Sequence, residues 1–68
     1  MKMIDMEYVK ELRCREGLRL IDMAEKLGYA SPNGYWRLEM GLTKLRAEHL
    51  VKLARVFDEP IDRFLRRT

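Results

Sequence analysis

Cysteine and histidine each occur once among the 68 residues, as Cys14 and His49. A single cysteine excludes an internal disulfide, and we expect a reducing cytoplasmic setting in which Cys14 fills a small space in the core. A metal site would have to be built mostly from carboxylates, and their spacing shows no cluster. We therefore predict no metal and no cofactor, and we expect His49 to be a surface or edge residue without a catalytic role.

Long apolar runs and the usual signatures of enzymes are also missing. The opening residues MKMIDMEYVK contain no unbroken apolar run of the kind found in signal peptides. No segment approaches the roughly 20 apolar residues of a membrane span. The sequence shows no nucleophile paired with a base and no glycine-rich phosphate loop. We expect a cytoplasmic protein that is not an enzyme, with no membrane partner and no small-molecule ligand.

Hydrophobic residues make up 47% of the chain, which is enough for one small domain spanning residues 1–68. The formal net charge is only +3, but residues 31–55 carry a basic excess over Glu39 and Glu48. The basic residues of this stretch are Arg37, Lys44, Arg46, Lys52 and Arg55. Positive charge is therefore concentrated in the middle of the chain.

Glycines separate short stretches of helical periodicity, and strand-like alternation is not sustained anywhere. Gly17, Gly28 and Gly41 each follow such a stretch, at the position where a left-handed helix end favours glycine. The pattern predicts an all-α fold of five short helices, the first of which has Asp5 as its N-cap. The expected ranges are residues 6–16, 20–27, 32–40 and 46–57, followed by a last helix from about Pro60 to Leu65.

The segment SPNGYWRLEMG, residues 31–41, carries the most specific signals in the chain. Ser31 followed by Pro32 marks a helix start, because serine accepts a bond from a free amide and proline has no amide to leave unsatisfied. Tyr35 and Leu38 then define the inward face.

The residues Asn33, Gly34 and Arg37 fall away from the inward face of this helix. Asparagine can pair bidentately with adenine and arginine with guanine, and a glycine lets a groove approach closely. The residue types alone support equally well an interpretation without base contacts. Asn33 and Gly34 would be ordinary first-turn residues, and Arg37 a solvated charge.

Three stretches of the chain together form a pattern that is specific for one protein family. KELRCREGLRLIDMAEKLGY, YWRLEMG and LVKLARVFDEPIDRFL resemble the helix-turn-helix family of the lambda repressor, Cro and the XRE regulators, over residues 8–65. The resemblance implies that the second and third of five helices form a helix-turn-helix, with the third in the major groove. The turn from Gly28 to this third helix is one residue longer than the common pattern, and the extra residue is expected among residues 29–31.

The resemblance also implies roles for individual residues. Asn33, Gly34 and Arg37 would contact bases. The expected contacts with the DNA backbone are Arg19, Ser31, Lys44 and Arg46. Arg13 and Glu39 would form a buried ion pair, and the end of a helix, which disfavours a carboxylate, also favours a cation near Glu39. The alternative is an exposed Glu39 without a partner.

Tyr35 and Trp36 keep two interpretations each, as contacts with DNA or as packing residues. Trp36 is turned by about 100° from Tyr35 around the helix axis, which places it on the flank of the helix. It would pack on the first helix or the following loop, or touch a sugar-phosphate or a thymine methyl group. A third alternative for Trp36 is an interface with a partner.

The predicted function is a sequence-specific transcriptional regulator, most simply a repressor that binds double-stranded DNA as a homodimer, formed on DNA if not before. The surfaces expected for self-contact are the last helix, around Ile61, Phe64 and Leu65, and the loop before the fourth helix. The alternative is a protein-interaction module of the same fold, such as an antitoxin or an accessory factor of a phage or mobile element.

Overall fold

The computed structural model describes residues 2–67, and the side chains of residues 4–65. Four α-helices account for most of this range, with a single 3-10 turn and two short strands near the ends of the chain. In chain order the elements are β1 (Lys2–Ile4), α1 (Met6–Arg15), α2 (Leu20–Leu27), α3 (Pro32–Glu39), α4 (Ala47–Phe57), the 3-10 helix η1 (Ile61–Phe64) and β2 (Leu65–Arg67).

The helices α1 and α3 begin where a side chain accepts a bond from a free amide. Asp5 accepts from the Tyr8 amide at 3.2 Å, and Ser31 accepts from the Gly34 amide at 3.4 Å. At the start of α2, Arg19 has no acceptor, and the Asp22 carboxylate instead takes the Arg19 amide at 2.8 Å. The predicted helix ranges are therefore correct to within one residue for α1 to α4.

The prediction of a last α-helix is wrong. Residues 61–64 form one 3-10 turn and not an α-helix, because four residues between Pro60 and an extended Leu65 leave no room for a second turn. The all-α prediction also missed a two-stranded antiparallel sheet, in which Lys2 pairs with Arg67 and Ile4 with Leu65. The Asp5 amide continues this pairing by donating to the Phe64 carbonyl at 2.7 Å.

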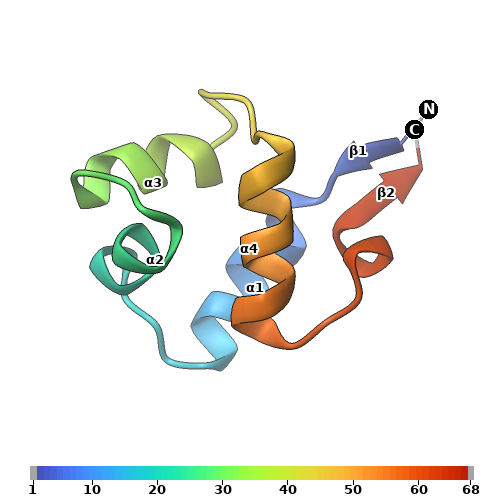
Figure 1. Ribbon diagram of the computed structural model, residues 1–68, viewed down its shortest axis with the longest axis horizontal. Helices are drawn as coiled ribbons and strands as arrows, with labels where there is room; N and C mark the ends of the chain where they lie inside the picture. The colour runs from blue at the N-terminus through green and yellow to red at the C-terminus, as the bar shows by residue number, and fades with distance from the viewer. Residues whose placement is uncertain (1, 68) are drawn as a thin grey trace.

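The core lies between the four helices and is closed by Phe64 of η1. In Figure 1, α2 and α3 lie together at one end, α1 and α4 cross in the middle, and the sheet forms the other end. The buried residues are Val9, Leu12, Met23, Ala24, Leu27, Tyr35, Leu38, Leu53, Phe57 and Phe64. Cys14 is exposed, which corrects its expected place in the core: it lies about 140° around α1 from Val9.

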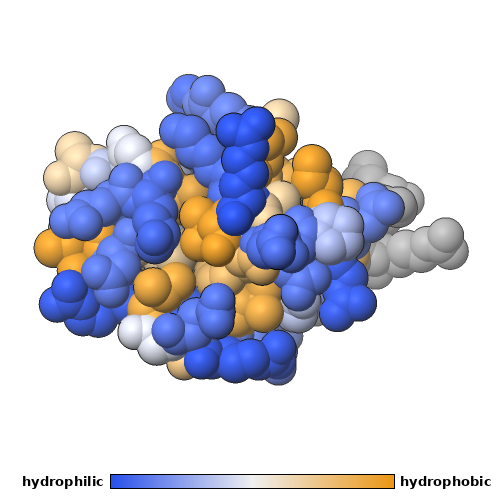
Figure 2. All heavy atoms as spheres, turned by 60° about the horizontal axis from the view of Figure 1, so that its bottom comes forward, coloured by the Kyte–Doolittle hydropathy of each residue, from blue (hydrophilic) through white to orange (hydrophobic). Residues whose placement is uncertain are grey.

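The face of the molecule seen in Figure 2 is mixed in character. Figure 2, which brings the lower side of Figure 1 forward, shows hydrophilic side chains around small hydrophobic areas, without one broad apolar face. A membrane span needs roughly 20 apolar residues, and no helix within residues 2–67 meets that requirement.

Candidate nucleic-acid interface

The α2–turn–α3 unit is held together by close backbone packing. Ala24 is buried on the inner side of α2, and its carbonyl accepts the Tyr29 amide at 2.8 Å as the chain leaves the helix. Gly28 ends α2 with a φ of 83°, which an L side chain rarely adopts. The turn then runs over Tyr29 and Ala30 to Ser31 and Pro32, which start α3.

Asn33 and Arg37 lie on the exposed face of α3, on the side opposite the buried Tyr35 and Leu38. Their spacing of four residues places them one turn apart on the same stripe of the helix. An amide and a guanidinium so placed can both reach into a groove in front of α3. The two side chains predicted to contact bases are thus both free of the core.

Gly34 has a reason inside the fold to lack a side chain. A Cβ at this position would lie 3.1 Å from Cδ1 of the Tyr29 ring, which is tighter than ordinary packing. The residue is half-buried under that ring. Its glycine therefore lets the turn pack on α3, and no approaching groove is needed to explain it.

Tyr35 and Trp36 differ in their surroundings. Tyr35 is fully buried, so it packs in the core. Burial, together with the neighbouring Glu39 carboxylate, raises the pKa of Tyr35 far above its usual range, and its hydroxyl has no hydrogen-bond partner among the described residues. Trp36 keeps 40% of its surface exposed and lies on the same side of α3 as Met40, which is 55% exposed.

The four residues expected at the DNA backbone are all exposed, but they are not equivalent. Lys44 lies in the loop after α3. Arg46 occupies the N-cap position of α4 without a side-chain cap bond, and its Nη1 lies 4.0 Å from Glu48 Oε1. Ser31 uses its hydroxyl as the cap of α3. Arg19 folds back on Asp22 at 3.1 Å, and the guanidinium lowers the pKa of that carboxyl.

A hollow of about 420 Å³ lies where the turn, α3 and the start of α4 meet. Arg37, Lys44 and Arg46 contribute positive charge to its wall, with Tyr29, Gly34 and His49 beside them. His49 is half-buried, and its Nδ1 lies 3.3 Å from the Tyr29 hydroxyl. Tyr29 and His49 are 20 residues apart, and no spacing pattern in the sequence connects them.

The ion pair between Arg13 and Glu39 joins α1 to the end of α3. Arg13 Nε lies 2.8 Å from Glu39 Oε2 and Arg13 Nη2 lies 2.9 Å from Oε1, in a two-pronged contact. Arg13 Nη1 also donates to the Leu18 carbonyl at 3.0 Å. The Glu39 side chain is only 4% exposed, and its hydrogen bonds raise the pKa of Arg13.

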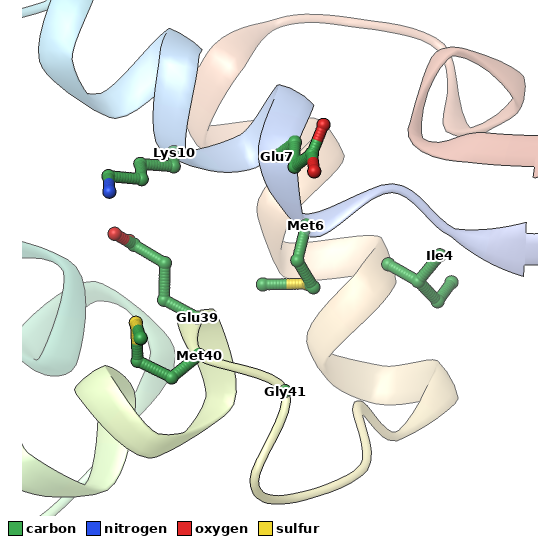
Figure 3. A pocket seen from close by; sticks show the side chains of 7 residues that line it. All are labelled: Ile4, Met6, Glu7, Lys10, Glu39, Met40 and Gly41. Atoms are coloured by element: carbon green, nitrogen blue, oxygen red, sulfur yellow. The ribbon is translucent and has the colours of Figure 1, made fainter.

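A second hollow, of about 390 Å³, lies beside this pair, between the start of α1 and the end of α3 (Figure 3). Met6 and Ile4 line it from one side. Glu39 and Met40 line it from the end of α3, and the Glu39 side chain points towards α1. Its lining is mostly apolar, so it does not gather positive charge as the first hollow does. Among the described residues, no three His, Cys, Asp or Glu side chains are grouped so that they could hold a metal ion.

Comparison with known proteins agrees with this geometry. A helix-turn-helix family model matches residues 9–64, which is well over half of the chain. Searches of curated proteins and of solved structures gave no match. The matched range runs from α1 to η1 and includes the α2–turn–α3 unit, the Arg13–Glu39 pair and the exposed face of α3. The chain therefore belongs to the lambda-repressor-like, or XRE, family of helix-turn-helix DNA-binding domains.

Proposed function

We propose that this protein is a sequence-specific transcriptional repressor that places α3 in the major groove of an operator. One observation carries the proposal: α3 turns Tyr35 and Leu38 into the core and presents Asn33 and Arg37 to the outside. These are the side chains best suited to reading adenine and guanine edges. The family match supports DNA binding, and the operator and the repressor role are our inference.

Contacts with the DNA backbone would hold α3 in register. Lys44 and Arg46 follow α3 directly and flank the hollow that Arg37 also lines, so they can reach phosphates at one edge of the groove. Arg19 and the Ser31 hydroxyl lie at the starts of α2 and α3, and Arg19 would have to exchange Asp22 for a phosphate. Such contacts set affinity and salt dependence, while the base contacts set specificity.

Repression would follow from occupancy of the operator, which excludes polymerase and needs no cofactor. One domain of this size reads only a few base pairs, so we infer that two copies bind a two-fold operator. Met40, Leu42 and Ile61 are exposed apolar residues outside the proposed groove contacts, and Leu42 and Ile61 belong to the loop before α4 and to η1, the two surfaces expected for self-contact.

The test begins with selection of binding sites from random duplex DNA, which should return a two-fold consensus. On that site we expect Arg37→Ala to weaken binding by about 1 to 3 kcal/mol and to relax the sequence preference at one position. Binding to mixed-sequence DNA should change much less. Equal losses on the two kinds of DNA would make Arg37 a phosphate contact instead.

Two further variants test whether a loss of binding comes from a base contact or from a phosphate contact. Lys44→Ala should reduce the slope of log Kobs against log salt by about 0.9, because one phosphate contact is lost. Arg55→Ala is the matched control, since Arg55 is an exposed arginine near the opposite end of α4 from the hollow. It should alter neither specificity nor slope. Absence of binding to any duplex at low salt would overturn the proposed function.

A further inference from the structure

The hollow lined by Arg37, Lys44 and Arg46 contains a residue that the proposed base and phosphate contacts do not use. His49 lies in the first turn of α4 with its ring against that of Tyr29, at a centroid distance of 5.0 Å. Its Nδ1 is 3.3 Å from the Tyr29 hydroxyl, and the ring forms part of the wall of the hollow. The only histidine of the chain is therefore built into the surface that faces the proposed DNA site.

The charged groups around His49 come from every element that meets there. Arg37 belongs to α3, Lys44 and Arg46 to the loop, and Glu48 to α4 itself. Lys52, one turn further along α4, has its Nζ 3.6 Å from where a Cβ on Gly28 would lie. Four cations thus face one carboxylate, and that carboxylate is exposed and 4.0 Å from Arg46. A hollow with this balance favours an anion.

We propose that a phosphate group of the DNA backbone occupies this hollow and that His49 binds it in its protonated form, so that DNA affinity rises as the pH falls. This inference rests on the proposed function and adds a ligand to the same site. Imidazole is the side chain whose charge changes between about pH 5 and pH 8. A phosphate binds imidazolium better than imidazole, so DNA binding is linked to proton uptake.

The Tyr29 hydroxyl lets the ring change its charge without losing its position. A hydroxyl donates to an unprotonated Nδ1 and accepts from a protonated one, so the contact at 3.3 Å serves both states. Burial raises the pKa of Tyr29, which keeps this hydroxyl protonated across the neutral range. The second ring nitrogen then remains for an oxygen of the phosphate.

The experiment compares the chain with two variants, His49→Gln and His49→Arg, on the selected operator and on a mixed-sequence duplex. Affinity is measured against salt at about pH 6 and about pH 8, on either side of the ordinary titration of imidazole. The unmodified chain should bind about three- to tenfold more tightly at the lower pH, with a salt slope steeper by up to about 0.9. His49→Gln should remove both differences, and His49→Arg should bind tightly at both pH values.

Both kinds of DNA should show the effect, because a phosphate contact carries no sequence information. The matched glutamine variant also subtracts the titration of any other group, such as the α-amino group. Thermal unfolding at both pH values checks that the variants are folded. As a second measurement, the one imidazole signal in the proton NMR spectrum should titrate at higher pH when duplex is present.

Three results would overturn the inference. The first is DNA binding by the unmodified chain that does not depend on pH, which leaves the proposed function intact. The second is a pH dependence that persists undiminished in His49→Gln. The third is an imidazole signal whose titration is the same with and without DNA. Absence of DNA binding at both pH values would instead remove the proposed function together with this inference.

Discussion

Glu39 carries a charge that the fold has almost completely removed from water. Its side chain is 4% exposed and is compensated by Arg13, which is 14% exposed. Removing one partner of such a pair leaves the other charge unpaired. We expect Glu39→Ala to lower the free energy of unfolding by about 3 kcal/mol, the lower part of the usual range, because Arg13 keeps some contact with water. Urea or thermal unfolding measures the loss.

The control is Glu11, a carboxylate that lies on α1. Glu11 pairs with Arg15 at 2.9 Å, but both side chains are 62% exposed. Glu11→Ala should therefore cost no more than about 0.5 kcal/mol. Replacing both Arg13 and Glu39 by methionine should recover most of the lost stability, because no unpaired charge remains. Equal losses for Glu39→Ala and Glu11→Ala would show that the pair does not stabilise the fold.

Trp36 is a large, 40% exposed aromatic residue on the flank of α3, and we expect it to touch a thymine methyl group at the edge of the groove. Burying one such group is worth about 0.8 kcal/mol, or about fourfold in affinity. Replacing the contacted thymine by uracil should therefore weaken the unmodified protein about fourfold. The same replacement should not affect Trp36→Ala. A gel-shift series with single uracil substitutions across the operator locates the position, and equal effects on both proteins at every position would exclude this contact.

The turn between α2 and α3 depends on the fit between Tyr29 and Gly34. Alanine at an exposed helical position usually stabilises by about 0.5 to 1 kcal/mol over glycine. At Gly34 the added Cβ would meet the Tyr29 ring at 3.1 Å, and that ring is also held by Tyr35 and His49. We expect Gly34→Ala to destabilise the protein by about 1 kcal/mol or more through overpacking.

A double-mutant cycle measures the coupling. In a Tyr29→Ala background the obstacle is gone, and Gly34→Ala should become stabilising. Urea unfolding of the four proteins gives the interaction energy directly. If the glycine replacement had the same effect in both backgrounds, the packing of the ring would not be the reason for the glycine.

The elements that the sequence predicted well are those with local signals. Ser31 and Pro32 start α3, and Gly28 ends α2, each through the conformation of one or two neighbouring residues. The sheet lacked any such signal, because three-residue strands show no alternation and their pairing joins the two ends of the chain. A last helix was predicted where Pro60 and four residues form only one 3-10 turn.

The candidate site divides in the same way. Asn33 and Arg37 could be placed outward because the 3.6-residue period puts Tyr35 and Leu38 inward. The hollow around His49 could not be predicted, since it depends on how α4 crosses the turn. The sequence places Gly34 on α3, but the contact that explains its missing side chain, with the Tyr29 ring, depends on how the turn folds back on α3.

The dimensions of the whole molecule set a limit on how copies share an operator. The Cα atoms extend over 31 × 23 × 19 Å, and successive half-sites on one face of DNA lie about 34–36 Å apart. Two copies centred one turn apart can therefore approach at the two-fold axis without overlapping. We expect cooperative binding of two copies to an inverted repeat with this spacing, measured by gel shift and sedimentation.

Inserting about five base pairs, half a helical turn, between the half-sites should abolish cooperativity, because the second copy moves to the opposite face of the duplex. Each isolated half-site should bind with the same weak affinity as before. If the original repeat bound no more tightly than a single half-site, the protein would act on DNA as a monomer.

The pairing of β1 with β2 makes the chain almost a closed ring. Lys2 and Arg67 are cross-strand partners, and they lie at the end of the molecule away from α2 and α3 (Figure 1). Directly opposed residues in such a ladder have Cα atoms about 4.5 to 5.5 Å apart, so a peptide of a few residues could join them. The chain could then be opened between α1 and α2, giving a circular permutant that keeps the surface proposed to face DNA. For the same reason, a fluorescent label or a second domain attached at either end would stand clear of the groove.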